Sequence, residues 1–352
     1  MNEQMPAYMT AKQAYIALEN KIQYLNRSTV PKFPPLPGYE GYEEYQQQLK
    51  IWRDWLEFEK TDPNLLKEDK PDGSTFKARV LFIYKIALMT MRFEPQMWFD
   101  AAQFCLENGL TEDAERLQDQ GLDANPESCL LAFAKADRTE TKTASESDPA
   151  ERGKVVRQPY NKLIDALYEL LKQTKERSEK DVAEVQERYA KEEQDEGQEK
   201  SSGSDDDENP EDAEAKSKDA NARRDAEISD LKERYAEQLH ELRRLITTAW
   251  VALIRAMRRI QGKGKPGSND LPGSRGILSE TRRRGNITSD LYIQCALTEW
   301  YCYKDPAALR LFDKGMTLYP TDENFALEYI KHLIAQSDLT SKSISSHIHT
   351  VP

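Results

Sequence analysis

The chain has 352 residues and a net charge of −12, and 38% of its residues are hydrophobic against 32% charged. With a mean hydropathy of −0.81, this composition argues against one large globule and favours a helical array with solvated outer faces and some disorder. The acidic charge argues against nucleic acid as the main partner. We find no charged-then-apolar leader and no apolar run long enough to span a bilayer, which leaves the nucleus and the cytoplasm as expected compartments.

Apolar residues at helical spacing predict four helices in the first hundred or so residues, over 8–26, 42–60, 76–92 and 95–108, and two more beginning near Thr111 and Pro126. The first two are separated by four prolines between Pro31 and Pro37. Residues 28–41 are therefore predicted to be an extended, Pro-rich connector that braces two helices, and the alternative is a ligand for a Pro-recognising groove. Residues 8–138 are assigned to the first part of a helical array.

Charge dominates the middle of the chain. Helical periodicity is lost over 139–158 and returns weakly from 159, and residues 191–216 hold 12 acidic residues against three lysines. Such a stretch has too little apolar surface to fold by itself and is predicted to be disordered. Residues 139–221 are therefore interpreted as a charged, largely disordered insertion with flanking charged helices, which could pair as an antiparallel coiled-coil hairpin.

Helical pattern is strong again in 222–336, the second part of the array. Residues 245–262 predict an amphipathic helix, 263–276 a loop, and three helices follow near 287–303, 305–318 and 322–337. The last residues, 337–352, predict an unstructured tail. Since no segment alternates polar and apolar residues for long enough to form a strand, the predicted fold class is all-α.

An aromatic pattern recurs on the predicted first helices of successive hairpins. Trp52, Trp55, Phe58 and Glu59 stand at offsets 0, +3, +6 and +7, and residues 292–299 repeat these offsets. At about 100° per residue, the first three positions share one helix face. The pattern therefore predicts core residues, in preference to a stacking platform for a base or a cofactor.

A second pattern marks the second helices. Ala114, Gly121 and Pro126 stand at offsets 0, +7 and +12, and residues 308, 315 and 320 repeat them. Small residues allow close helix packing, proline ends the helix, and the 31 residues from Pro95 to Pro126 are typical of helix-hairpin repeats. The predicted repeat-defining core comprises Trp52, Trp55, Phe58, Glu59, Val80, Ala87, Pro95, Trp98, Phe104, Ala114, Gly121, Pro126, Leu130, Phe133, Trp250, Leu253, Tyr292, Glu299, Ala308, Gly315 and Pro320.

The run WRDWLEFE lacks the Leu-Gly and Tyr of a tetratricopeptide first helix and resembles the HAT (half-a-tetratricopeptide) repeat. Longer runs, above all YKDPAALRLFDKG and PTDENFALEYIKHLI, resemble the family of the large HAT-repeat subunit of cleavage stimulation factor in its fungal form. The resemblance covers residues 8–138 and 242–336. It implies an α-solenoid of HAT repeats.

The same resemblance implies a non-enzymatic scaffold of the mRNA 3′-end cleavage and polyadenylation machinery, located in the nucleus with the cytoplasm as a second location. It also implies binding to other cleavage and polyadenylation factors, to an RNA-binding partner subunit, and to a second copy through the C-terminal repeats. Because the chain departs from the family pattern at both ends, we expect a fragment or a truncated gene model, with the segment that holds the RNA-binding subunit outside it.

Two groups of residues are candidate contacts. Trp300, Tyr301 and Tyr303 are predicted to be a dimer face, since 287–336 combines the strongest family match with aromatic residues on more than one helical face. A basic 263–284 loop, with Arg275, Arg282, Arg283 and Arg284, is a candidate contact for a partner or for RNA. Its alternatives are a solvated loop, a dock for an acidic partner segment, or a dock for the acidic segment of this chain.

No catalytic, cofactor-binding or metal-binding residues are predicted. The four histidines are not paired at the spacing of zinc hydrolases, the cysteines form no CxxC pair, and the segment 262–268 resembles a phosphate loop only superficially because it follows a helix. The rival functions are a HAT scaffold of splicing or ribosomal RNA processing and weak, direct RNA binding through the basic loop. An enzyme ranks behind both.

Overall fold

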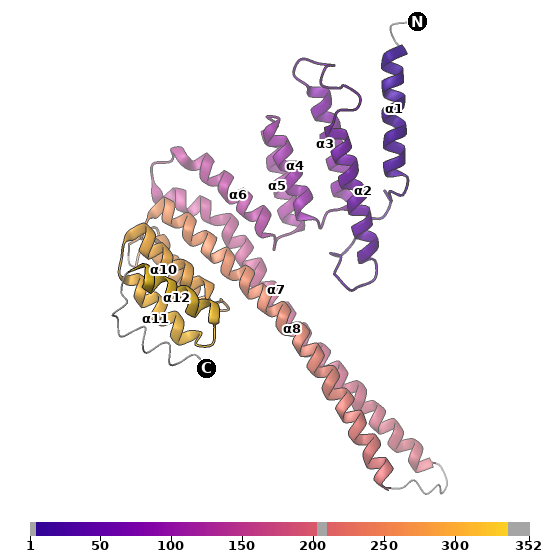
Figure 1. Ribbon diagram of the computed structural model, residues 1–352, viewed down its shortest axis with the longest axis vertical. Helices are drawn as coiled ribbons and strands as arrows, with labels where there is room; N and C mark the ends of the chain where they lie inside the picture. The colour runs from indigo at the N-terminus through magenta and orange to yellow at the C-terminus, as the bar shows by residue number, and fades with distance from the viewer. Residues whose placement is uncertain (1–4, 203–209, 266, 337–352) are drawn as a thin grey trace. The chain divides into compact units, whose positions relative to one another are not determined.

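The computed structural model of the protein describes residues 5–202, 210–265 and 267–336, and these residues are helical with short connections and contain no strand. The chain divides into two compact units, Met1–Arg138 and Thr139–Pro352. The boundary falls within helix α6, Cys129–Lys142 (Figure 1). The predicted all-α fold class is confirmed over the described residues.

The first unit is a series of helices in which each packs on the next along the chain. They are α1 (Met5–Ile22), α2 (Tyr42–Lys60), α3 (Ser74–Thr90), α4 (Pro95–Glu107) and α5 (Thr111–Ala124). Pro95 occupies the first turn of α4, where its missing N–H costs nothing. Gly109 has φ 75° just after the same helix, a left-handed conformation that favours glycine and reverses the chain into α5.

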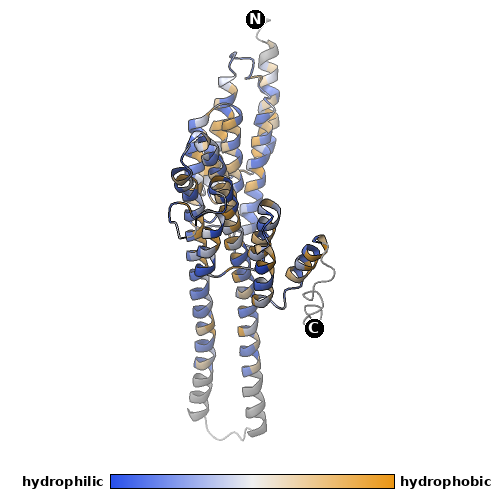
Figure 2. Cartoon of the chain, turned by 90° about the vertical axis from the view of Figure 1, so that its left-hand side faces the viewer, coloured by the Kyte–Doolittle hydropathy of each residue, from blue (hydrophilic) through white to orange (hydrophobic). Residues whose placement is uncertain are grey.

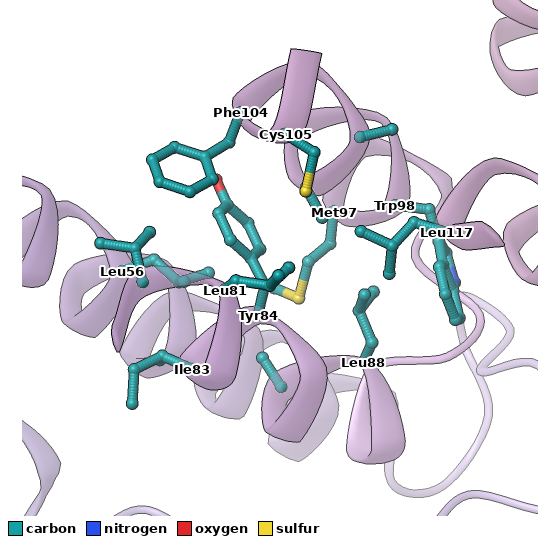
Figure 3. Packing of buried hydrophobic residues seen from close by; sticks show 14 of the residues in the cluster. Leu56, Leu81, Ile83, Tyr84, Leu88, Met97, Trp98, Phe104, Cys105 and Leu117 are labelled. Atoms are coloured by element: carbon teal, nitrogen blue, oxygen red, sulfur yellow. The ribbon is translucent and has the colours of Figure 1, made fainter. Parts of the chain in front are cut away.

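One hydrophobic cluster joins α2 to α5. Figure 3 shows Leu56, Tyr84, Met97 and Phe104 turned toward a shared interior, and the rings of Tyr84 and Phe104 lie 5.9 Å apart. These side chains come from first and second helices of neighbouring hairpins. Burying each large side chain contributes about 2–3 kcal/mol, so the hairpins of this unit stabilise one another through this interior.

The second unit contains α7 (Pro149–Ser202), α8 (Pro210–Gln261), α9 (Gly273–Arg284), α10 (Asp290–Tyr303), α11 (Ala307–Leu318) and α12 (Glu323–Ala335). A short 3-10 turn, Thr143–Ser145, precedes α7. Helix α8 packs against α7, α9 and α10, and α10 packs against α11 and α12. Trp250 on α8 and Phe312 on α11 are 1% and 0% exposed, and they mark two centres of the apolar interior.

Helices α7 and α8 form a long antiparallel hairpin (Figure 1). Contacts run from Tyr168 with Trp250 (3.4 Å), through Asp181 with Tyr235 (2.5 Å), to Arg188 with Glu227 (2.6 Å). Residue numbers thus rise on one helix as they fall on the other. Before the part drawn in grey, the hairpin is coloured mostly hydrophilic in Figure 2. There the pairs Asp181–Tyr235 and Arg188–Glu227 replace the apolar contacts found nearer the base.

The structure differs from the sequence-based boundaries in two places. The loss of helical pattern expected over 139–158 is wrong for 139–142, which end α6, and from Pro149, where α7 begins. In 149–158, Val156 is the one large apolar side chain that is buried, and Gly153 is buried beneath the Gln261 side chain, so the apolar spacing is sparse. Part of the acidic segment, residues 203–209, and the predicted tail from 337 lie outside the described residues. The predicted domain boundaries stay predictions.

The second difference is helix α9, which the sequence did not predict. Residues 273–284 were interpreted as loop because glycines and arginines dominate them, yet Ile277, Leu278 and Thr281 form a buried face. Apolar contact with α8 and the main-chain hydrogen bonds of the helix outweigh the weak local propensity.

Candidate functional site

The aromatic face of α2 belongs to the interior of the first unit. Trp52 and Trp55 are 0% and 5% exposed and stack with ring centroids 5.3 Å apart, whereas Phe58 is only half-buried. These aromatic side chains therefore pack within the protein, and a base or a cofactor has no access to the face of Trp52.

Glu59, at the fourth position of the pattern, is a buried carboxylate with three donors. Trp55 Nε1 donates to it over 2.9 Å, and Arg79 on α3 donates from Nε over 3.0 Å and from its terminal nitrogen over 2.6 Å. The Glu59 side chain is 2% exposed and that of Arg79 is 35% exposed. A buried charge requires such compensation, so this pair fixes the packing of α3 against α2.

Glu299 repeats this arrangement on α10. Arg275 on α9 donates to it over 2.8 and 2.7 Å and also donates to Asp305 over 2.7 Å. Lys263 contacts the same Asp305 carboxylate over 2.9 Å, and the two cations hold the pKa of Asp305 far below its usual range. Arg275, predicted as a partner contact, is thus paired within the chain. The sequence pattern identified both acidic residues but not their arginine partners. Arg79 follows Glu59 in the sequence, whereas Arg275 precedes Glu299, so no common spacing indicates the pairs.

The glycines of the second helices stand where a side chain cannot fit. A Cβ on Gly121 would lie 2.9 Å from Cβ and Cγ of Trp98, and a Cβ on Gly315 would lie 2.2 Å from Cζ of Phe325. The absence of a side chain at Gly121 therefore allows close packing against α4, the first helix of the same hairpin. At Gly315 it allows close packing against the following helix, α12. Both close approaches agree with the predicted need for small residues.

The residue before Pro126 and the residue before Pro320 each tie a hairpin together, and the sequence pattern had not singled them out. Asn125 donates from Nδ2 to the carbonyl oxygen of Arg92 over 2.9 Å, and the Tyr319 hydroxyl donates to the carbonyl oxygen of Ile287 over 3.0 Å. Each acceptor lies three residues before its first helix, α4 or α10. The only signal in the sequence is the position directly before the proline.

The other residues of the predicted core vary in burial. Leu130 is a correction: it is 36% exposed, while its neighbour Leu131 is 0% exposed, because the buried face of α6 lies one residue further along. Phe133 and Pro95 are half-buried, and Pro126 and Pro320 are exposed at helix junctions. The remaining members are buried: Val80, Ala87, Trp98, Phe104, Ala114, Trp250, Leu253, Tyr292 and Ala308.

The structure places the basic cluster on helix α9, which corrects the loop interpretation. The guanidinium of Arg282 lies 5.1 Å from the Tyr292 ring centroid, and that of Arg284 lies 4.2 Å from the Tyr168 ring centroid and 2.9 Å from Asp165. Arg283 is exposed. Most of the cluster is therefore engaged within the second unit, and Arg283 alone of the three consecutive arginines points its charge to solvent without a partner in the described residues.

A hollow of about 660 Å³ lies beside this cluster. It is lined by five cationic side chains and by Glu280, which pairs with one of them, Arg157, over 2.6 Å. The five cations are Arg157, Lys263, Lys265, Arg275 and Arg283. Since three of them already have carboxylate partners, the excess positive charge of the hollow is small.

The three predicted dimer residues do not share one exposed face. Trp300 is half-buried and its ring meets that of His332 edge-on at 5.2 Å. Tyr303 is half-buried beside Lys263, whose Nζ lies 4.9 Å from the ring centroid. Tyr301 is 63% exposed. Of the three, only Tyr301 offers its ring to another molecule.

Metal-binding groups and reactive thiols were sought among the described residues. These residues contain no group of three or more His, Cys, Asp or Glu side chains that could hold a metal ion. Burial raises the pKa of Cys105 to about 11 and that of Cys295 to about 12, so neither thiol ionises near neutral pH. Within the same part of the chain, no helix has the length and apolar content needed to cross a bilayer.

Comparison with known proteins identifies relatives over the whole of this helical array. The family model described as Suppressor of forked protein (Suf) matches residues 1–344. The mRNA 3′-end-processing protein rna14 of Aspergillus fumigatus is 49% identical over 339 residues, which cover 96% of this chain and 32% of the relative. The rna-14 protein of Neurospora crassa is 41% identical over 98% of this chain and 30% of its own length.

More distant relatives keep the same coverage. RNA14 of Yarrowia lipolytica is 26% identical over 97% of this chain and 33% of its own length. The chain thus spans about a third of the length of the curated relatives it matches. These matches confirm the resemblance and the HAT-type fold class predicted from the sequence. The chain belongs to the Suppressor of forked family.

Proposed function

We propose that the chain is a non-enzymatic scaffold segment of the pre-mRNA 3′-end cleavage and polyadenylation machinery, acting in the nucleus. The observation that carries the proposal is the 49% identity, over 96% of the chain, to a protein named for mRNA 3′-end processing. The described residues support it because the buried carboxylates of Glu59 and Glu299 are used to hold neighbouring helices together. A scaffold acts by presenting its outer helical surface to partner factors.

The direct test is affinity purification of the tagged full chain from fungal nuclear extract, with bound proteins identified by mass spectrometry. Recovery of cleavage and polyadenylation factors is expected. Recovery of splicing or ribosome-assembly factors in their place would contradict the proposal. The Gly121→Ala variant tests whether recovery of these factors requires an intact first unit, because its added methyl group clashes with Trp98.

We also propose that residues 287–336 carry self-association, together with the binding of other processing factors. Support comes from an apolar stripe on α12, where Leu327, Ile330 and Ile334 are 50%, 37% and 56% exposed. They share one helix face because they are three and four residues apart. A monomeric mass in light scattering at micromolar concentration would contradict self-association of this chain.

Weak contact with RNA is the second candidate, carried by the 660 Å³ hollow and the exposed Arg283. Because most neighbouring cations are paired with acids, we expect only a shallow salt dependence of binding, reflecting one or two phosphate contacts. A fluorescence-anisotropy titration of single-stranded RNA at two salt concentrations tests it, with Arg283→Glu as the variant.

A further inference from the structure

Helix α3 carries an apolar stripe on the side turned away from the core. Phe82 and Met89 are 55% and 64% exposed, and the stripe also contains Ala78 and Lys85. These positions follow one another at intervals of four, three and four residues, so they share one face of the helix. The outer positions of α5, the second helix of the next hairpin, are polar or charged, Arg116 and Gln120 among them. The fold itself does not require the apolar stripe on α3.

A hollow of about 270 Å³ adjoins this stripe. Leu88 and Met89 of α3, Trp98 of α4 and Leu117 of α5 provide its apolar lining, and Figure 3 shows Leu88, Trp98 and Leu117 converging from their three helices. The indole N–H of Trp98 already donates a hydrogen bond to the carbonyl oxygen of Arg92 over 2.8 Å. The Trp98 ring therefore contributes only apolar surface to the hollow. A cavity of about 150 Å³ lined by such side chains holds a benzene ring. This hollow therefore has room for one large apolar side chain.

The rim of the hollow is cationic. Lys85 and Arg116 both contact the Asp113 carboxylate, over 3.4 and 2.7 Å, and their side chains remain 52% and 66% exposed. Two cations thus share one acid, in a chain whose net charge is −12. The excess positive charge at this rim favours an occupant with a carboxylate next to its apolar anchor.

We propose that the groove formed by the stripe Ala78, Phe82, Lys85 and Met89 and the adjoining hollow docks an amphipathic helix of another protein. One large apolar side chain of that helix enters the hollow, a second covers Phe82 about 10 Å along the helix, and an acidic side chain pairs with Lys85 or Arg116. This is the helix-in-groove mode of recognition, with apolar anchors at i and i+3, i+4 or i+7. The inference rests on the proposed scaffold function and names one surface through which it acts.

The test is a selection of phage-displayed peptides of about 16 residues on the folded full chain, followed by affinity measurement by fluorescence anisotropy. Enriched peptides are expected to share the helical apolar spacing with at least one acid. Met89→Glu should weaken their binding at least about tenfold, and Lys85→Glu about fivefold. Leu318→Glu is the matched control, since Leu318 is also exposed, at 51%, and lies on α11 in the other unit.

Circular dichroism and thermal unfolding verify that the exposed substitutions leave the fold intact. The inference is overturned if no enriched peptide depends on Met89, if the enriched peptides are basic, or if Met89→Glu converts a dimer into a monomer in light scattering. The last result would make a second copy the occupant. Loss of processing factors from the affinity purification, with peptide binding retained, would overturn the proposed pathway and leave the groove in place.

Discussion

Asn125 and Tyr319 perform the same task with unrelated side chains. Each residue stands directly before the proline that follows its hairpin. The Asn125 amide donates a hydrogen bond to the carbonyl oxygen of Arg92 over 2.9 Å, and the Tyr319 hydroxyl donates one to the carbonyl oxygen of Ile287 over 3.0 Å. Both acceptors lie three residues before the first helix of the hairpin. The bond closes the hairpin at its open end. The repeat thus keeps a hydrogen bond at this position while the residue type changes.

Removing one of these bonds gives the first prediction. Tyr319→Phe keeps the ring contact with Tyr292 but leaves the Ile287 carbonyl group without its donor. We expect the free energy of unfolding to fall by about 1 kcal/mol, measured by urea denaturation. Tyr301→Phe is the control: Tyr301 is 63% exposed and its change should have no measurable effect. Equal effects of the two substitutions would show that the bond contributes nothing.

Gly121 should not tolerate alanine. The added methyl carbon would meet Cβ and Cγ of Trp98 at 2.9 Å, and these atoms lie at the base of the side chain, where rotation cannot move them away. We expect a loss of about 1–3 kcal/mol in the free energy of unfolding. Gln120→Ala, an exposed neighbour on the same helix, should change it by less than about 0.5 kcal/mol. An unchanged Gly121→Ala variant would mean that α4 and α5 can separate without cost.

Two arginines in the first unit should differ sharply in their contribution to stability. Arg79→Met leaves the Glu59 carboxylate, 2% exposed, with Trp55 as its remaining donor among the described residues, and we expect the free energy of unfolding to fall by about 2–4 kcal/mol. Arg53→Met removes a surface pair with Glu94 in which Arg53 is 51% exposed, and should cost less than about 1 kcal/mol. Urea denaturation measures the free energy of unfolding of both variants at one temperature. Similar losses would contradict a special role for the buried carboxylate.

The stability of the second unit should fall in mild acid because of His332. The residue is 4% exposed beside Phe312 and Trp300, and burial lowers its pKa from 6.5. A lowered folded-state pKa means that the unfolded chain binds the proton more tightly, so stability is complete above about pH 6.5 and decreases as the pH falls below it. We expect a fall of roughly 1–3 °C in Tm between about pH 7 and pH 5.5. Tm of the His332→Gln variant should vary less over this range, and an equal pH dependence would exclude this histidine as the cause.

The four cysteines should differ in reactivity. Cys302 is exposed, whereas burial raises the pKa of Cys105 and Cys129 to about 11 and that of Cys295 to about 12. At about pH 8, a thiol-specific chromogenic disulfide should therefore label one cysteine rapidly, and Cys302→Ser should abolish that fast phase. A fast phase that persists in the variant would show that a buried thiol becomes accessible through local opening.

The sequence revealed the features of the fold that depend on local periodicity. Trp52, Trp98 and Trp250 were predicted as core residues and are buried, since they lie on apolar helix faces that can be recognised within one stretch of chain. Helix α9 was missed because Ile277 and Leu278 are its only large apolar side chains, set among glycines, polar residues and arginines. What decides its conformation is contact with α8, which a local pattern does not contain.

Pairing between distant residues was equally hidden. Arg79 lies 20 residues after Glu59, whereas Arg275 lies 24 residues before Glu299, so no single spacing connects the buried acids with their cations. The same holds for Trp300 and Tyr303. Both were predicted as partner contacts from their aromatic character, and both pack on residues of their own unit, His332 and Lys263.

The long α7–α8 hairpin determines which charges can interact within one chain. Arg284 lies against Tyr168 and Trp250, and the Arg188–Glu227 pair lies 20 residues further along α7, a rise of roughly 30 Å. Since ionic screening at physiological salt acts over about 8 Å, the charges of α9 and the Arg188–Glu227 pair are electrostatically independent. An anionic molecule that approaches the exposed Arg283 therefore does not feel the charges of this pair.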